Sequence, residues 1–408
     1  MDLRLKKPAP CIEWIWIGMK SAACCLGLVL CFGLTELQAS SDNPVLQWER
    51  LRIRPAVTVV QIVSDNVFLE SADIKQESIT KIAPELKFDV ALSETFLTHL
   101  YYRYERFEYA QYANFRRDHH YAGLSLKRHT PKGSHLVVGG DYSETAVQPF
   151  FEDDESKVYR KSRGYAETVL IFSDIFEVHS ELAHVARRFD DDAYAEDDFD
   201  RNTFALDFLY RKLLKLPLLV AFDVMQQNDR SESVEDNDLT RYRGHVGARW
   251  KATEKLKGDL KAGYLVADFE RSEDDGTLSV ETDLTYDFSE ITTLSLELYR
   301  NIVPSTRVER ETGDYFILTG GSFGIRYGYF DPLSIQLRYR YEEKDFPYEL
   351  PGVLARLDKR TLYEGTLVYN LRKTAEFTLR YEYRENESSW DEEDYKENRY
   401  IVSIALFL

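Results

Sequence analysis

Cysteine is missing from most of this 408-residue sequence. All four cysteines lie within the first 31 residues, and none follows Cys31. A chain that lacks thiols beyond that point has no disulfide framework, cysteine nucleophile or cysteine metal site there. Long apolar runs are missing too. The apolar stretch from Ala22 to Leu34 is shorter than the roughly 20 residues that a membrane-spanning helix needs, which argues against an uncleaved helical anchor.

Motifs of common catalytic sites are absent as well. The sequence contains no Walker loop, no glycine-rich dinucleotide fingerprint and no metalloprotease helix motif. Glu177, His179 and Glu181 share one face of a predicted strand, and His119 and His120 begin another. No serine lies in a recognisable catalytic setting beside them. We therefore expect no enzymatic activity and no cofactor.

Basic residues are in deficit, with 52 Lys and Arg against 70 Asp and Glu. Without residues 1–39, 48 basic and 67 acidic residues remain, a formal net charge of −19. Such a surface repels phosphate groups, so we expect no nucleic acid as a partner. The 27 Tyr and 23 Phe are too many aromatic residues for a disordered acidic chain. The sequence therefore predicts a folded protein.

The amino terminus has the layout of a secretory signal peptide. Basic residues, among them Arg4 and Lys20, precede the apolar run, and small Ala39 follows it. We expect cleavage before Ser40, which makes residues 1–39 the signal peptide and residues 40–408 one domain. A lipoprotein is less consistent with the sequence, because the lipidated cysteine normally follows a small residue and Cys31 follows Leu30.

After the leader the sequence repeats a pattern of apolar and polar residues with a period of two. In the segment from Leu333 to Glu342, Leu and Tyr side chains point one way and Arg, Ser and Gln point the other. A helix could not separate these two sets, whereas a strand does so by geometry. Reading the chain this way gives 18 candidate strands, which begin near residues 51, 77, 96, 117, 135, 161, 176, 201, 216, 239, 256, 277, 291, 314, 333, 359, 375 and 397.

The connections between these strands alternate in length. Short polar turns, such as residues 93–95 and 372–374, alternate with long acidic links, such as residues 146–160 and 343–358. This alternation is typical of outer-membrane barrels, whose short turns face the periplasm and whose long loops face outward. The sequence therefore predicts an all-β fold: a closed, antiparallel, up-and-down transmembrane barrel of about 18 strands, within 16 to 18. With an even strand number both termini would lie in the periplasm of a Gram-negative bacterium.

A soluble propeller or sandwich also has many short alternating strands and is the alternative fold. Two features favour the membrane barrel. Tyr and Phe cluster near the ends of the apolar faces, as in the aromatic girdles of membrane proteins. The last strand, with Tyr400, Val402 and Ile404 on one face, runs to the end of the chain at Leu408. Such a strand resembles the signal that outer-membrane assembly machinery recognises, although the usual last residue is Phe.

A barrel of this size leaves an aqueous lumen, so we expect passage of a solute. The polar faces of the later strands carry bunched basic residues with acidic ones between them. The ordinary polar lining of a porin would explain such a wall. A more specific hypothesis is a row of guanidinium groups that binds an anionic solute, such as an acidic polysaccharide. The candidate pore-lining residues are Arg241, Arg243, Arg249, Lys251, Arg326, Arg338, Arg340, Arg380, Arg384, Glu281 and Asp283.

Acidic runs fall on the links expected to face outward, among them residues 152–155, 190–192 and 391–394. A run of charge is usually a solvated surface. The functional alternative is bridging by Ca²⁺ or Mg²⁺ to anionic lipopolysaccharide, although no link has the fixed spacing of an EF-hand. Whether these runs hold a metal stays open, and membrane lipid and lipopolysaccharide are the expected surroundings.

The start of the mature chain carries a family resemblance. An alternating strand is followed by Asp65-Asn66-Val67-Phe68, then by the segment Ile79 to Leu86, then by Tyr101-Tyr102-Arg103-Tyr104-Glu105. This resembles the β-barrel porin type 2 family. The arrangement of strands is similar over the whole mature chain, whereas the residue motifs are similar over about its first 70 residues. The resemblance implies an outer-membrane barrel that passes or supports a secreted polysaccharide. A general diffusion porin and a surface barrel with a plugged lumen are the alternatives.

Overall fold

The computed structural model describes residues 46–48, 50–147, 157–191, 194, 197–211, 217–229, 238–250, 255–270, 275–305, 315–330, 332–347, 355–372 and 374–408. The predicted signal peptide lies outside these residues. Nowhere in the described ranges is there a helix long and apolar enough to cross a membrane. Their helical turns are the short 3-10 helices η1 (Ala113–Phe115) and η4 (Asp391–Glu393).

The described residues form one short strand and 18 long ones. The first ten are β1 (Leu46–Trp48), β2 (Leu51–Ser64), β3 (Glu77–Ala91), β4 (Phe96–Tyr109), β5 (Arg117–His129), β6 (His135–Ala146), β7 (Val158–Ile171), β8 (Phe176–Phe189), β9 (Phe199–Tyr210) and β10 (Leu218–Asp229). The others are β11 (Leu239–Trp250), β12 (Leu256–Phe269), β13 (Asp275–Ser289), β14 (Thr292–Pro304), β15 (Tyr315–Phe330), β16 (Leu333–Asp345), β17 (Leu357–Leu371), β18 (Ala375–Ser388) and β19 (Tyr395–Phe407).

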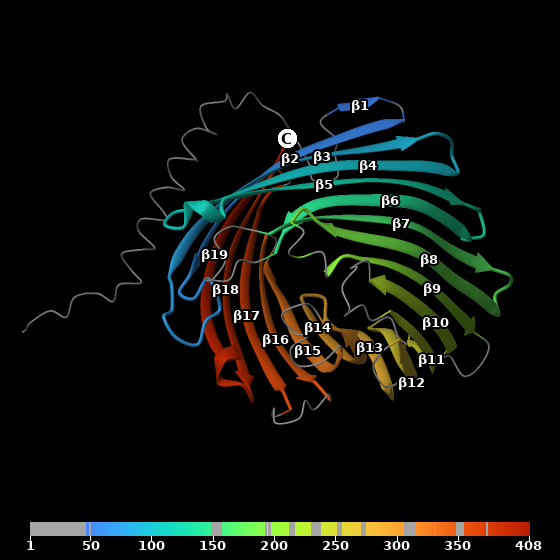
Figure 1. Cartoon of the computed structure of the whole chain (residues 1–408). Coiled ribbons are helices and arrows are strands. Elements are labelled where there is room, and N and C mark those ends of the chain that lie inside the picture. Colours follow the sequence, from blue (N-terminus) through green and yellow to red (C-terminus); the bar gives the residue numbers. More distant parts are fainter. Residues whose placement is uncertain are drawn as a thin grey trace, which may run out of the picture.

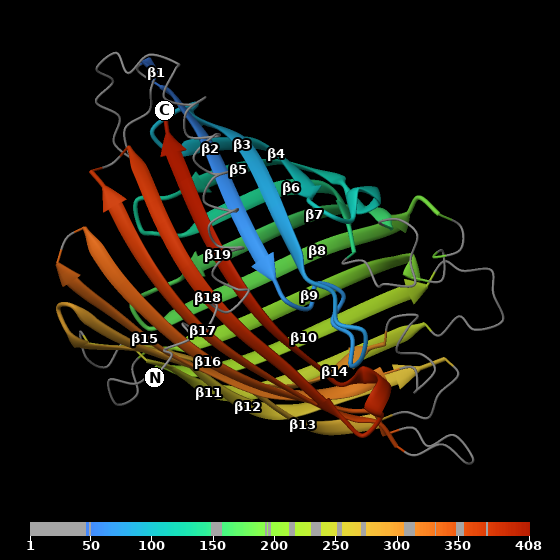
Figure 2. The same cartoon turned by 90° about the vertical axis from the view of Figure 1, so that its left-hand side faces the viewer.

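Each long strand pairs antiparallel with the next, and β19 pairs with β2, so the sheet closes into a barrel (Figures 1 and 2). The predicted closed barrel of 18 strands is therefore confirmed, and every predicted strand start lies within three residues of the observed one. The sequence did not predict β1, which pairs with residues Leu51 to Ile53 of β2. Full closure removes the free strand edges that the apolar core of a bilayer does not tolerate.

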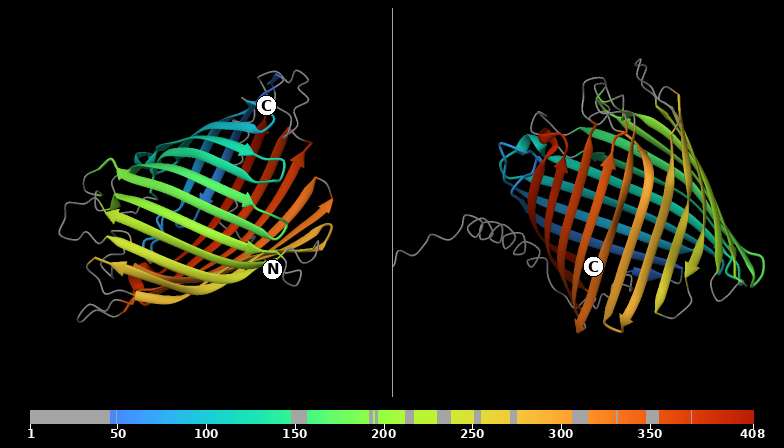
Figure 3. Two further views of the ribbon diagram at one scale, coloured as in Figure 1. Left: turned by 90° about the vertical axis from the view of Figure 1, so that its right-hand side faces the viewer. Right: turned by 90° about the horizontal axis from the view of Figure 1, so that it is seen from below.

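The two ends of the barrel differ in the length of their connections. At one end, short turns such as residues 92–95 and 130–134 join the strands, and we call this the short-turn end. Leu408 lies there, where its backbone N–H donates to the Pro55 carbonyl over 3.0 Å. The opposite, long-loop end carries η1, η4 and the longer links. The strands run steeply tilted between these ends (Figure 3).

One face of the barrel wall is apolar and exposed. Leu and Val side chains such as Val246 and Leu278 are 63% and 68% exposed, and tyrosines such as Tyr264 share this outward face. Soluble proteins rarely expose large apolar side chains on nearly every strand. The outward face therefore matches the lipid-facing band of a membrane barrel.

The seam between β2 and β19 is held at the long-loop end by the loop of residues 65–76. Asn66 is fully buried, and its side-chain amide donates to the carbonyls of Glu70 and Lys396, both over 2.9 Å. Phe68 is 1% exposed and packs edge-on against Tyr112 at 5.0 Å between ring centroids. This loop therefore ties the first strands of the barrel to the last one.

A second apolar cluster lies where β14 meets β12. The ladder between β13 and β14 begins at Val280 and Arg300, so the long-loop ends of these strands lie outside it. There Ile302 of β14 is fully buried among apolar residues of β10 to β12, and the rings of Phe269 and Tyr315 stack at 4.6 Å. The long-loop end of β14 thus packs against β12, two strands away.

Candidate functional site

The inward-facing side chains of the later strands are the predicted pore lining. On β11, Arg241 and Arg243 alternate with the exposed Tyr242, so they point to the opposite face. Arg241 Nη1 donates to the side-chain oxygen of Asn301 on β14 over 3.2 Å, across β12 and β13. Side chains two or more strands apart meet on the concave face of a curved sheet. The candidates on β11 therefore lie on the inner wall.

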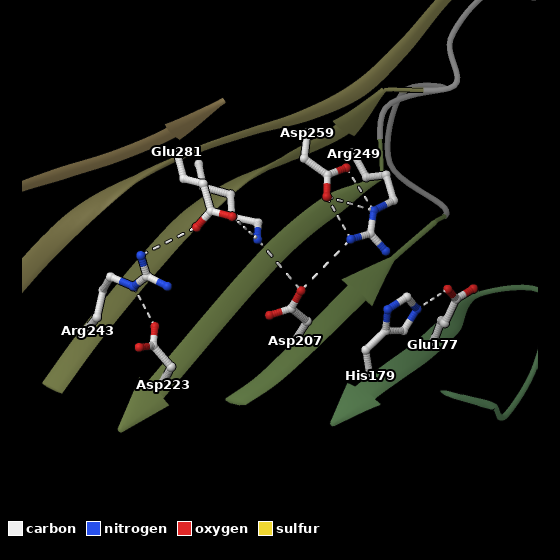
Figure 4. A network of polar contacts seen from close by, with 9 residues as sticks. Glu177, His179, Asp207, Asp223, Arg243, Arg249, Asp259 and Glu281 are labelled. Carbon is white, nitrogen blue, oxygen red and sulfur yellow. Dashed lines mark hydrogen bonds and ion pairs between the residues drawn. The ribbon is translucent and has the colours of Figure 1, made fainter. Parts of the chain in front are cut away.

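Ion pairs neutralise this part of the wall. Arg243 lies 2.5 Å from Asp223 on β10 and 3.5 Å from Glu281 on β13. Arg249 forms a bidentate pair with Asp259, with Nε and Nη2 at 2.8 and 2.7 Å from the two carboxylate oxygens. These pairs extend across several strands in Figure 4.

Further pairs complete the network. Lys261 lies 3.4 Å from Glu281 and 4.0 Å from Asp207 on β9. The network joins four cationic side chains to four carboxylates, namely Arg241, Arg243, Arg249 and Lys261 to Asp207, Asp223, Asp259 and Glu281. Its formal charge is zero, so it offers a solute little net attraction.

Asp283 lies beside this network. It is exposed, and it lines the same cavity of about 550 Å³ as Arg249 and Glu281. Lys251, the remaining candidate of this region, falls outside the described residues.

A second group of candidates lies on β18 and β19, where three arginines share two glutamates. The Glu382 carboxylate is 3.6 Å from Arg380, 2.8 Å from Arg384 and 3.3 Å from Arg399 of β19. Glu397, which is 2% exposed, lies 3.7 Å from both Arg384 and Arg399. Cations therefore outnumber carboxylates in this group. Arg399 and Glu397 were not predicted from the sequence, although both lie on the polar side of the alternation.

The arginines of β15 and β16 are less engaged. Arg326 and Arg338 are exposed, and neither makes a hydrogen bond or ion pair with another described residue. The nearest carboxylate to Arg340 is that of Glu342, at 3.9 Å. The sequence-predicted residues thus divide into a neutralised set on β11 to β13 and a cationic set on β15 to β18.

Next to the cationic set, the inward-facing side chains of β15 are small and project little from the sheet. The Tyr299 hydroxyl of β14 passes over Gly320 and donates to the Glu342 carboxylate on β16. A Cβ atom at Gly320 would lie 2.9 Å from that hydroxyl oxygen, so the contact requires glycine here. Ser322 and Gly324 follow on the same face. Gly324 is the register partner of Arg338 on β16.

Comparison with protein families finds one match, over residues 191–407, to the family described as "Putative beta-barrel porin 2". The match covers more than half of the chain. The chain belongs to this family. The matched region contains β9 to β19 and every predicted pore-lining residue, whereas the motifs that suggested the family lie in the first strands. No match is found among curated proteins.

Solved structures support the fold of this porin. The outer-membrane protein OccK1 (OpdK) of Pseudomonas aeruginosa is 12% identical, with a TM-score of 0.50, and the match covers 87% of this chain and 99% of that one. The siderophore receptor PirA of the same organism is 10% identical over 88% of this chain and 80% of that one, with a TM-score of 0.47. At 12% identity the likeness to OccK1 shows a shared barrel fold and no more. The protein is thus an outer-membrane β-barrel porin of Gram-negative type.

The histidines that were considered as catalytic candidates in this porin do not act together. His119 and His120 point to opposite faces, since His119 is buried inside and accepts from the Ala146 N–H over 3.1 Å, whereas His120 meets the Tyr102 hydroxyl on the outside. His179 contacts Glu177, which also pairs with Arg211. No serine hydroxyl in the described part of the chain contacts His179.

The porin also contains a pair of a histidine and a serine that was not predicted from the sequence. His245 Nε2 lies 3.0 Å from the Ser279 hydroxyl on β13, and both residues are buried. The Ser279 hydroxyl donates to the Arg300 carbonyl over 3.1 Å, so it accepts from the histidine. A nucleophile would have to donate its proton to the histidine instead. The pair therefore holds β11 to β13 and β14 together.

Most of the acidic links considered as metal sites lie partly or wholly outside the described residues. Residues 152–155 fall outside the described residues, as do Asp192, Glu196 and residues 235–236 and 273–274. Within the described ranges no group of three metal-ligating side chains comes together. On η4 one of the acidic residues, Glu393, pairs with Arg356 over 3.0 Å.

Proposed function

We propose that this porin is an open channel for anionic solutes and that its physiological role is the export of an acidic polysaccharide. The observation that carries the proposal is the set of inward arginines without a carboxylate partner. Arg326 and Arg338 make no hydrogen bond or ion pair with a described residue. Among the described residues, Arg360 on β17 donates only to the Asn386 amide oxygen, at 3.2 Å. Guanidinium groups bind carboxylates in two-pronged fashion, which suits an acidic sugar polymer.

The carboxylates nearby make the attraction weak, which favours transport. Glu364 and Glu376 lie on the same face, where they accept hydrogen bonds from Thr366 at 3.2 Å and Thr378 at 3.4 Å. A channel must bind its solute enough to admit it but not enough to hold it. Free arginines between carboxylates meet both conditions. A hydrophilic polymer needs such a route, because its hydroxyl groups would lose their hydrogen bonds in the hydrocarbon layer.

The orientation belongs to the same proposal. We place the short-turn end, with both mature termini, in the periplasm, and the long-loop end outside, as in other barrels of this kind. The solute would then enter beside β1 and leave past η1 and η4. Strand β19 would be presented to the outer-membrane assembly machinery, and lipopolysaccharide would surround the outward face. The wall would serve passage rather than catalysis.

Conductance tests this proposal. In planar bilayers with a KCl gradient, the purified protein should conduct and its reversal potential should show preference for chloride, since a few charges in a confined lumen set ion selectivity. A conducting protein without ion preference would indicate a general diffusion porin. A folded protein that never conducts would indicate a plugged structural barrel. The apolar packing of Val67 and Phe68 against Val60 and Ile62 favours that alternative, because it places residues of the 65–76 loop over part of the wall at the long-loop end.

A further inference from the structure

A small cavity opens in the inner wall over β16, β17 and β18. Its volume is about 220 Å³, and its lining includes Arg340, Glu342, Arg360, Leu362 and Arg384. Ligand pockets for drug-sized molecules are larger, of about 300 to 1,000 Å³. The cavity therefore has room for one small chemical group or one ring rather than for an extended molecule.

The strand register explains why three arginines meet there. Leu362 of β17 lies directly opposite Arg340 on β16 and directly opposite Arg384 on β18. Arg360 lies one pleat along β17 on the same face, opposite Glu342. The half-buried Leu362 thus forms an aliphatic floor with a guanidinium group on each of three sides.

These guanidinium groups have hydrogen-bond donors to spare. Arg360 uses Nε for the Asn386 amide oxygen at 3.2 Å and meets no carboxylate among the described residues. Arg340 donates no hydrogen bond to a described residue. The Glu342 carboxylate, 3.9 Å from Arg340, is already bonded to the Tyr299 hydroxyl. Arg384 is held by Glu382 at 2.8 Å, which fixes its position at the cavity.

We propose that this cavity binds one carboxylate-bearing sugar unit, of the hexuronate class, as a subsite of the channel. The inference rests on the proposed function and deepens it. The carboxylate would bridge Arg340 and Arg360, whose free N–H groups match its two oxygens. The apolar face of the sugar ring would lie on Leu362. Glu342 on the cavity wall disfavours a dianion such as phosphate, because its own negative charge repels the second charge of that ion.

Binding of glucuronate to the full-length mature protein in detergent micelles tests the subsite. Calorimetric titration should show saturable binding of glucuronate and much weaker binding of glucose, which is neutral, and of inorganic phosphate. Arg360→Gln and Arg340→Gln should each raise the dissociation constant about tenfold or more, because each removes charge-assisted hydrogen bonds. Arg163→Gln is the matched control. Arg163 lies on the inner wall of β7, where it pairs with Glu181 at 2.8 Å, so its loss should leave glucuronate binding unchanged.

The result that overturns the subsite is distinct from the result that overturns the channel. Absence of glucuronate binding by protein that still conducts anions would refute the subsite alone. Equal binding by wild type and the Arg340 and Arg360 variants, or tighter binding of phosphate than of glucuronate, would also refute it. Glucuronate binding that these variants lose, in a protein that does not conduct, would support the subsite and refute the open channel.

Discussion

Asp65 and Asn398, 333 residues apart, close the barrel with a two-pronged hydrogen bond. The backbone N–H of Asn398 donates to one oxygen of the Asp65 carboxylate over 2.7 Å, and its side-chain amide donates to the other over 2.8 Å. Asp65 directly follows β2, and Asn398 belongs to β19. The pair therefore lies at the seam, where the first long strand meets the last.

We predict that Asp65→Asn weakens this closure. Asparagine presents one oxygen and one amide donor to a site that offers two donors, so one hydrogen bond is lost and two donors face each other. The expected cost is about 1–3 kcal/mol of unfolding free energy. The measurement heats samples to increasing temperatures and then separates them on a detergent gel, where the folded and unfolded forms migrate differently. The temperature at which the folded band is lost is compared between variants. Asp73→Asn in the same loop is the control, because Asp73 is 70% exposed and only pairs with Lys75; equal shifts for both variants would contradict the prediction.

A second prediction concerns Gly320, one of the small inward-facing residues of β15. Gly320→Ala would place a Cβ atom 2.9 Å from both the Tyr299 hydroxyl and the Tyr341 carbonyl, so it should displace Tyr299 from Glu342 and cost about 1–3 kcal/mol. Gly244→Ala is the matched control, since nothing lies within 4 Å of a Cβ atom there. Urea unfolding in micelles, followed by tryptophan fluorescence, compares the two. A Gly320 variant as stable as the Gly244 variant would show that the close passage is unimportant.

The long-loop end offers a third prediction. Arg356, which is 3% exposed, forms two bonds of 2.8 and 2.9 Å to Asp358, which is fully buried, and one of 3.0 Å to Glu393 of η4. Arg356→Met leaves a buried carboxylate without its cation, at a cost of about 3–5 kcal/mol. We expect hydrogen exchange to speed up around η4 and the start of β17. The Arg356 guanidinium also lies over the Phe346 ring, 5.0 Å from its centroid. The double variant Arg356→Met/Asp358→Leu should restore slow exchange, and its failure to do so would point to this ring contact instead.

The alternation of the sequence predicted the strands, because its period of two depends on neighbours along the chain. It did not predict which side chains meet. Arg241 reaches Asn301 and Tyr299 reaches Glu342 across other strands, and such contacts depend on the tilt and stagger of the closed sheet. Nor did it predict buried apolar residues on the inner face, such as Leu219. Their burial depends on what lies inside the barrel, which no single strand specifies.

The fourth prediction separates the cationic wall from the neutral one. The double variant Arg326→Glu/Arg338→Glu should shift ion selectivity from anions toward cations, because it reverses two charges that no described carboxylate neutralises. Arg243→Gln is the comparison, since it changes a network that has its own carboxylates and should alter selectivity less. Reversal potentials in planar bilayers provide the measurement at low salt, where screening is weakest. A larger shift in the Arg243 variant would assign selectivity to β11 instead.

The last prediction concerns the polymer. If the channel exports an acidic polysaccharide, deletion of its gene should lower polysaccharide on the cell surface and raise polymer or its fragments in the periplasm, because the hydrocarbon layer blocks a hydrophilic chain. The Arg326→Glu/Arg338→Glu variant refines this experiment. It retains the strands, seam and loops, so it should reach the outer membrane in normal amount while its reversed charges repel the polymer. Restoration of export by the wild-type gene but not by this variant would tie export to the wall charges. Normal surface polysaccharide in the deletion strain, under conditions where the parent strain makes it, would refute the export role and leave a general porin or a structural barrel as the better account.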